Sequence, residues 1–202
     1  MSLTNIGLVA FVKTKLGTPY VYGAKGKVLT QANFNYLQNT YRQYVPNSDE
    51  SKVGKICVDC SGLISWYTGK IKSSAAFAAE SKRQPINTIS LAPIGAAVWR
   101  QGHIGVYIGN GEIIEARGSQ FGTVRTKVGQ RDFTHWFLLK DIEYVEEDVE
   151  MVEKGKIIVD GEEQVVEMIR KDGITYIKTR DIANVLGLKV GNKGSVPTLE
   201  TK

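Results

Sequence analysis

One cysteine, one histidine and one glutamate stand at positions that could assemble a thiol nucleophile with its base. Cys60 lies where a turn enters the apolar stretch 61–64, and His103 and Glu115 follow on a pair of expected strands. A cysteine thiol attacks a carbonyl carbon when histidine accepts its proton and a third polar group orients the imidazole. The sequence therefore predicts acyl-transfer chemistry if the three side chains meet in space.

The position of Cys60 at the start of a helix predicts a lowered thiol pKa. Unpaired N–H groups and the positive end of the helix dipole favour the thiolate, and a nearby imidazolium would add to this effect. Asp59 or Ser61 could cap the helix, and Gly62 leaves room for a substrate backbone. The alternative is a buried cysteine that acts as a small hydrophobic residue.

Cys57 and Cys60 also form a C-x-x-C pair, which is typical of dithiol redox centres and of half a zinc site. A redox centre of this kind expects a βαβ start, whereas this chain begins with helices. The only histidines, His103 and His135, are not at zinc-finger spacing. We therefore expect no metal, no cofactor and no disulfide framework, and we interpret Cys57 as a core residue and His135 as structural.

The register of the hairpin over residues 103–116 decides whether the base can be oriented. A two-residue Asn-Gly turn would put His103 and Glu115 on opposite faces. A three-residue loop, 109–111, with a bulge shifts the register by one and separates apolar from polar residues far better. This second register puts His103 and Glu115 on one face, with Glu115 opposite Gly105, where the absent side chain leaves room.

The remaining pattern predicts an α+β fold in which N-terminal helices pack on a central antiparallel sheet. Helices come first and strands follow. The expected helices cover residues 4–16, a stretch capped by Thr30, and residues 60–69 and 73–81; the expected strands cover 96–100, 103–108, 112–116, 124–128 and 133–140.

Residues 141–153 hold seven acidic side chains and no basic one, which indicates a solvated linker. We place a first domain at 1–142, the linker at 143–154 and a small βββα unit at 155–202. At about 48 residues this last unit is marginal on its own, which favours packing or self-association.

Charge is divided unevenly along the chain. Residues 1–140 carry 17 Lys and Arg against 7 Asp and Glu, a net +10, whereas residues 141–202 carry 9 against 14, a net −5. The basic part should be attracted to something anionic, either nucleic acid or an acidic wall polymer. The N-terminus lacks the pattern of a secretory signal, so we expect synthesis in the cytoplasm.

Four motifs in this order resemble the NlpC-type cell-wall peptidases, a papain-like family. They are GTPYVYGA at 17–24, DCSG at 59–62, HIGVYIGNG at 103–111 and IEA at 114–116, and they span about residues 5–140. The resemblance implies a papain-like fold and hydrolysis of peptidoglycan stem peptides, typically between D-γ-glutamate and the diamino acid. It implies Cys60 as nucleophile, His103 as base and Glu115 in the third polar position.

The resemblance also assigns substrate-binding positions to Tyr20, Asp59 and Ser61. The third catalytic residue of the family is often histidine, whereas this chain has Glu115, and related papain-like wall amidases also use an acidic residue there. A wall amidase cutting the N-acetylmuramoyl-L-alanine bond or a cross-bridge is therefore an alternative. A non-catalytic basic module directed to nucleic acid is another, although we expect no nucleic acid partner.

The tail, residues 156–190, resembles the small domain at the N-terminus of copper amine oxidases and of some wall-associated proteins. It contains neither histidine nor cysteine, so we expect no metal there and predict wall binding or self-association. A wall-lytic domain without a signal suggests a phage-type endolysin that reaches the wall after release. Its basic part would then be attracted to anionic wall polymers.

Overall fold

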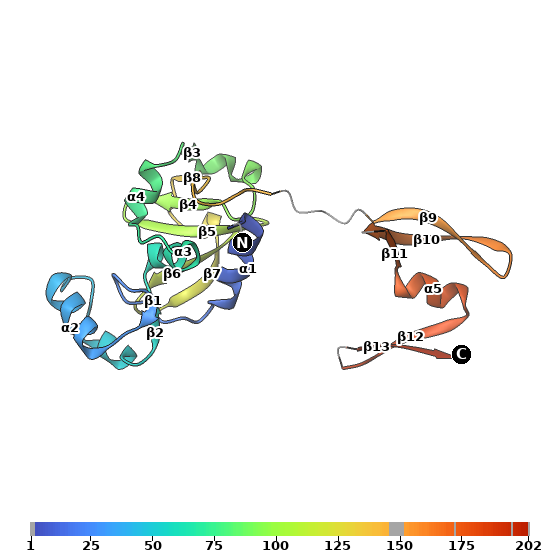
Figure 1. Cartoon of the computed structure of the whole chain (residues 1–202), viewed down its shortest axis with the longest axis horizontal. Coiled ribbons are helices and arrows are strands. Elements are labelled where there is room, and N and C mark those ends of the chain that lie inside the picture. The colour runs from blue at the N-terminus through green and yellow to red at the C-terminus, as the bar shows by residue number, and fades with distance from the viewer. Residues whose placement is uncertain (1–2, 146–151, 172, 195, 202) are drawn as a thin grey trace. The chain divides into compact units, whose positions relative to one another are not determined.

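The computed structural model describes residues 3–145, 152–171, 173–194 and 196–201, and the chain divides into two compact units. The first unit comprises residues 1–145 and the second residues 146–202. Figure 1 shows helices and a large sheet in the first unit and a mainly β structure in the second.

An antiparallel sheet of six strands forms the centre of the first unit, in the order β3-β8-β4-β5-β6-β7. Consecutive strands β4 to β7 are neighbours, joined by tight turns. The strands are β3 Gln84–Pro85, β4 Ala97–Arg100, β5 His103–Gly109, β6 Glu112–Gly118, β7 Gly122–Lys127 and β8 His135–Phe137. The strand predicted at 133–140 is thus reduced to three residues.

Four helices precede the sheet, and each begins at a polar cap. The side chains of Thr4, Thr30, Asp59 and Ser73 each accept a hydrogen bond from a backbone N–H three residues later. Such caps satisfy N–H groups that the helix itself leaves unpaired. The helices are α1 Asn5–Thr14, α2 Gln31–Thr40, α3 Cys60–Thr68 and α4 Ser74–Ala79; the short 3-10 helices are η1 Asn47–Lys52, η2 Ile86–Leu91 and η3 Val128–Gln130.

Alternation along β5 and β6 gives the sheet two apolar faces. Ile104 and Val106 of β5 pack with Leu63 and Ile64 of α3, while Tyr107 faces the opposite cluster. The α+β class, with helices packed on a central antiparallel sheet, is confirmed. The opposite cluster contains Ala96, Val98, Tyr107, Ile113, Phe133 and Trp136.

A smaller lobe carries the chain into α3. Strand β1 (Lys25–Val28) pairs antiparallel with β2 (Ile56–Val58), and a separate core forms around Phe34 and Leu37 of α2. Cys57 is fully buried in this core, and both cysteines are free thiols. The helix capped by Thr30 is confirmed as α2. The two strands of this lobe were not predicted, because strands of four and three residues give no readable alternation.

The second unit has a three-stranded antiparallel sheet in the order β11-β10-β9, followed by helix α5 and a hairpin of β12 with β13. The predicted βββα order is present, and the closing hairpin is an addition. The elements are β9 Glu153–Val159, β10 Glu162–Lys171, β11 Ile174–Ile177, α5 Thr179–Val185, β12 Leu188–Lys193 and β13 Val196–Thr201.

Half of the predicted linker, 143–154, falls outside the described residues. Its first residues belong to the first unit: the backbone N–H groups of Glu143 and Val145 bond to Leu3 and Asn5. Its end, from Glu153, is already part of β9. No helix among the described residues is long and apolar enough to cross a membrane.

Candidate active site

The register of the β5–β6 hairpin brings His103 and Glu115 together, as predicted. Val106 pairs with Ile114 and Tyr107 with Ile113, and a bulge then lets Gly109 pair with Glu112. The turn therefore closes on two residues, Asn110 and Gly111, both at positive φ, and the prediction of a three-residue loop is wrong. The bulge between Tyr107 and Gly109 shifts the register by one residue instead, so the predicted pairing of the two strands is kept.

Gly105 provides the predicted space between the two side chains. A Cβ atom at this position would stand 3.2 Å from Cβ of Glu115 and 3.3 Å from the Ile114 carbonyl oxygen. A larger residue would therefore press against the backbone and side chain that hold the carboxylate. The glycine allows Glu115 to stay fully buried beside β5.

His103 donates from Nε2 to Oε2 of Glu115 over 2.6 Å. Glu115 is ionised and can only accept, so the proton of the neutral imidazole lies on Nε2 and Nδ1 is left as the basic nitrogen. The ring is buried and stacks on Phe133, with centroids 5.7 Å apart. His103 is thereby fixed in both its tautomer and its plane.

Two further residues, which the sequence did not single out, hold Glu115. Thr126 donates to Oε1 over 2.7 Å, and Arg131 donates to Oε1 over 2.7 Å and to Oε2 over 3.2 Å. Burial raises the pKa of Glu115, but the hydrogen bonds from His103, Arg131 and Thr126 outweigh it and lower the pKa to about 2. Glu115 therefore stays charged across the physiological range.

Cys60 is the first residue of α3, as predicted, and only 7% of it is exposed. Burial, followed by the charge of Asp59, raises the pKa of Cys60 to about 11. The backbone amides of Ile104 and Ser61 and the Lys25 ammonium act in the opposite direction but are weaker. The prediction of a lowered pKa is therefore wrong, because desolvation exceeds the effect of the helix N-terminus.

The backbone of β5 approaches the thiol directly after His103. The Ile104 amide lies close enough to Cys60 to stabilise its thiolate, and Gln101 and Gly102 line the same pocket as Cys60. Among the described residues, no hydrogen bond joins the thiol to the His103 ring. The structure thus brings the nucleophile to the start of β5, next to the Ile104 amide.

Asp59 and Ser61, the predicted substrate-binding residues on either side of Cys60, are already occupied by Lys25. The Lys25 ammonium donates to both Asp59 oxygens, over 2.9 and 2.7 Å, and to Oγ of Ser61 over 2.7 Å. Ser61 in turn donates to Asp59 over 3.0 Å. Lys25 was not predicted, because it comes from β1 and precedes Asp59 by 34 residues with no motif that links the two.

Tyr20, the third predicted substrate-binding residue, is a core residue beside Cys60. It is 9% exposed, and burial, with contributions from the charges of Cys60 and Asp59, raises its pKa above the ordinary range. It packs in the same apolar cluster as Cys60 and does not line the pocket in front of the thiol. Its role toward substrate stays a prediction.

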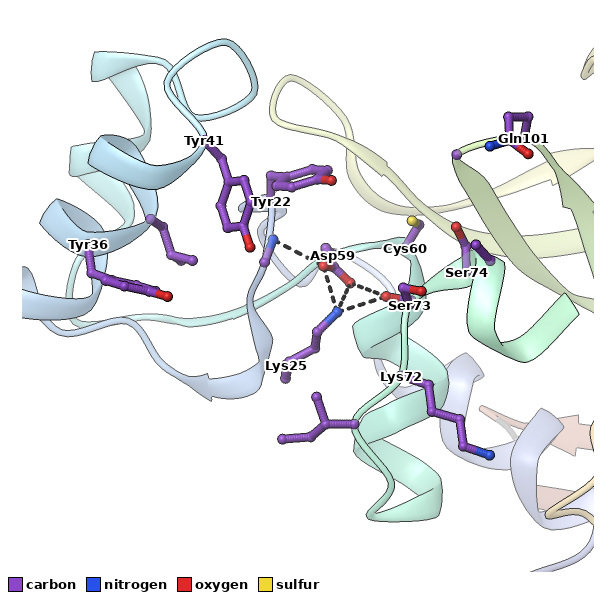
Figure 2. Close-up of a pocket in the computed structure, with 16 residues that line it drawn as sticks. Tyr22, Lys25, Tyr36, Tyr41, Asp59, Cys60, Lys72, Ser73, Ser74 and Gln101 are labelled. Carbon is purple, nitrogen blue, oxygen red and sulfur yellow. Dashed lines mark hydrogen bonds and ion pairs between the residues drawn. The ribbon is translucent and has the colours of Figure 1, made fainter. Parts of the chain in front are cut away.

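A pocket of about 510 Å³ opens in front of Cys60. In Figure 2, Asp59 lies between Cys60 on one side and Tyr41 on the other, with Tyr22 above it and Lys25 below it. The remaining wall of the pocket comes from α2 and from the segment that leads into α4. Its residues there include Tyr36, Leu37, Ile71, Lys72, Ser73 and Ser74.

Cys57 and His135 lie apart from this pocket. The Cys57 thiol points toward the backbone oxygens of Lys52 and Lys55, and His135 contacts Thr134 and the Trp99 ring. In the described part of the chain, no three His, Cys, Asp or Glu side chains are grouped so that they could hold a metal ion.

Comparison with known proteins finds similarity in solved structures alone. No protein-family model matches the chain, and no curated protein matches it. Among solved structures, 14 chains match. The peptidoglycan hydrolase RipB from Mycobacterium tuberculosis is 21% identical with a TM-score of 0.45, and the match covers 69% of this chain and 67% of that one.

Two more matches have similar values. The NlpC/p60 domain of the peptidoglycan hydrolase SagA is 18% identical (TM-score 0.45), covering 68% of this chain and all of that one. NlpC1 from Trichomonas vaginalis is 18% identical (TM-score 0.45), covering 66% of this chain and 42% of that one. The chain thus spans less than half of the length of NlpC1.

Proposed function

We propose that the first unit is a cysteine peptidase that hydrolyses amide bonds in peptidoglycan stem peptides. The observation that carries the proposal is the buried pair of His103 and Glu115, whose Nε2 and Oε2 atoms are 2.6 Å apart. His103 begins β5, and the backbone amide of the next residue, Ile104, approaches the Cys60 thiol. A polarised imidazole next to a thiol at a helix start is the arrangement of a thiol hydrolase. The four motifs that resemble NlpC-type peptidases supply the substrate class.

The raised pKa of Cys60 defines how the reaction begins. Because the thiol is neutral at pH 7, Nδ1 of His103 takes its proton as sulfur attacks the amide carbon, rather than beforehand. Backbone N–H groups at the start of α3 stabilise the oxyanion. The imidazolium then gives the proton to the leaving nitrogen, the C–N bond breaks, and a thioester remains on Cys60.

Water completes the cycle. His103 accepts a proton from the water molecule that attacks the thioester, and it returns this proton to the departing sulfur. The products are a free amine and a carboxylic acid, and the thiol is restored. Glu115 stays ionised throughout and stabilises the imidazolium that forms in each half of the reaction.

The decisive experiment is Cys60→Ala. We expect this variant to keep its fold and to lose lysis of purified peptidoglycan. Cys57→Ala is the matched control, because it removes the other thiol, which lies in the separate core of the smaller lobe. Lysis by folded Cys60→Ala would contradict the proposal and leave the non-catalytic binding module.

We further propose that the bond cut is the D-γ-glutamyl–diamino acid bond and that the protein acts as a phage-type endolysin after release from the cytoplasm. Mass spectrometry of digested peptidoglycan distinguishes this bond from the muramoyl-alanine and cross-bridge bonds of a wall amidase. New amino groups on the diamino acid are expected. New amino groups on alanine would indicate the amidase.

The second unit is proposed to bind the wall or to mediate self-association, in keeping with its resemblance to the small copper amine oxidase N-terminal domain. The basic first unit is proposed to add attraction to anionic wall polymers. Binding to walls should weaken as salt rises. A chain ended at residue 145 that keeps full wall binding and the same oligomeric state would remove any such role of the second unit.

A further inference from the structure

The wall of the pocket next to Cys60 is a saturated ion pair. Asp59 accepts at Oδ1 from Lys25, from Ser61 Oγ and from the Gly62 amide, and at Oδ2 from Lys25 and from the Gly23 amide. A carboxylate offers about four lone-pair sites, so these five contacts leave no acceptor free. The side chains of Asp59 and Lys25 are 7% and 20% exposed, so the pair is largely withdrawn from water.

This wall is unsuited to a substrate ammonium group. Such a group would find the Asp59 carboxylate already neutralised and would stand against the like charge of Lys25. An ammonium taken out of water without an acceptor is strongly disfavoured. An acylated nitrogen carries no charge and meets neither penalty, since Lys25 and Asp59 together form a polar but neutral surface.

The pocket also continues beyond the ion pair. Tyr36 and Tyr41 line it on the side away from Cys60, as Figure 2 shows, and Tyr22 lines it nearer to the ion pair; Tyr36 is 64% exposed. Tyr44 stacks on Tyr22, with centroids 4.7 Å apart, and extends the same aromatic surface. A substrate that ended at the ion pair would leave this surface unused, whereas one that continues past its nitrogen can lie on it.

We infer that the substrate is N-acylated where it crosses the Lys25–Asp59 pair, so that the protein cuts stem peptides still joined to a larger structure rather than peptides with a free amino end. This inference rests on the proposed function and specifies the substrate class of the same site. Lys25 is the residue that determines it. Removing Lys25 uncovers Asp59 and should create a site for an ammonium group.

The test compares two synthetic stem peptides that differ only in an N-acetyl group on the first alanine. The wild-type protein should cut the acetylated peptide about tenfold more efficiently, as kcat/KM, than the free peptide. Lys25→Met should lower this ratio about tenfold, because the free peptide gains the uncovered carboxylate as a partner. Cleavage is followed by chromatography and mass spectrometry.

Three variants complete the design. Lys25→Arg keeps a cation at Asp59 and should keep the preference, and so should Lys27→Ala, which removes an exposed lysine from the same strand. If Lys25→Met fails to fold around an unpaired Asp59, Lys25→Met with Asp59→Asn removes both charges and should bring the ratio near one. In this double variant, retention of the wild-type ratio overturns the inference.

The outcomes separate this inference from the proposed function. A wild-type protein that lyses peptidoglycan but cuts the two peptides equally, prefers the free one, or cuts neither overturns the inference and leaves the peptidase standing. An unchanged ratio in folded Lys25→Met also overturns it. A wild-type protein that neither lyses peptidoglycan nor cuts either peptide defeats the proposed function itself.

Discussion

Asp59 and Glu115 are two buried carboxylates that flank the candidate site, each saturated with donors and each paired with one cation. Glu115 is sealed within the sheet, where its partners His103, Thr126 and Arg131 come from residues 103–131. Asp59 lies in the pocket wall, and its partner Lys25 comes from a different lobe. One buried carboxylate thus lies behind the His103 ring, and the other lines the pocket in front of the Cys60 thiol.

The two carboxylates act on their neighbours in different ways. Glu115 holds the His103 ring in one tautomer and orientation through its hydrogen bond to Nε2, whereas Asp59 raises the pKa of Cys60 and therefore weakens the resting nucleophile. A buried carboxylate next to a catalytic group therefore does not always assist that group. The role of the carboxylate depends on whether a positive or a negative charge develops on the neighbouring group during the reaction.

The two carboxylates, Glu115 and Asp59, should differ most in what happens when the charge of Glu115 is removed. Glu115→Gln keeps the shape but removes the charge that holds His103 in its tautomer, and we expect kcat to fall by about 10²–10⁴. Glu112→Gln on the same strand, where Arg125 is the partner, is the control and should leave lysis unchanged. A folded Glu115→Gln protein with more than half of wild-type activity would contradict the orienting role.

The contribution of ionised Glu115 to the free energy of unfolding should appear in the pH dependence of stability. Its pKa of about 2 in the folded protein lies below its ordinary value of 4.5, so its contribution is complete above pH 4.5 and is lost as pH falls toward 2. The lowering corresponds to up to about 3 kcal/mol of unfolding free energy. Urea unfolding at pH 7 and pH 3 measures it, and Glu115→Gln should show a correspondingly weaker loss on acidification. Equal losses in both proteins would place the acid sensitivity elsewhere.

A glycine lies close to each carboxylate, and the two should differ in cost. At Gly62 a Cβ would stand 2.3 Å from the Ala24 carbonyl oxygen, whereas at Gly105 the nearest atom is 3.2 Å away. Gly62→Ala should lower the unfolding free energy by about 1–3 kcal/mol despite the better helix propensity of alanine, and Gly105→Ala by less. Thermal unfolding of both variants checks this order, and a more stable Gly62→Ala protein would reverse it.

Neutralising Asp59 should have a milder effect, on the reactivity of the Cys60 thiol. Asp59→Asn removes a charge that raises the pKa of Cys60, so alkylation of Cys60 by iodoacetamide at pH 7 should accelerate several-fold. Because burial is the larger cause, the rate should still rise with pH well above neutrality. Mass spectrometry separates Cys60 from the buried Cys57. A wild-type thiol that reacts fully at pH 6 would contradict the raised pKa.

Local patterns were sufficient to predict the half of the site that lies on the hairpin. Apolar alternation predicted the pairing that sets His103 against Glu115, and the turn that leads into an apolar stretch, with Asp59 or Ser61 as a possible cap, located the start of α3 at Cys60. Lys25 and Arg131 escaped prediction, because each reaches its carboxylate from a separate segment with no periodic signal. The thiol pKa was wrong for a related reason, since burial depends on packing that a motif does not contain.

The close contact of Gly62 with the Ala24 carbonyl oxygen has a consequence for how the protein folds. That oxygen also accepts the Asp59 amide over 2.9 Å, so the loop that delivers Lys25 is fastened to the first turn of α3. The hairpin closes through short loops, whereas this junction joins residues some 35 positions apart, and long-range contacts of this kind are expected to form more slowly. We therefore expect a partly folded chain to hold the proton acceptor in place before it holds the thiol, so that reactivity is among the last properties that the molecule acquires.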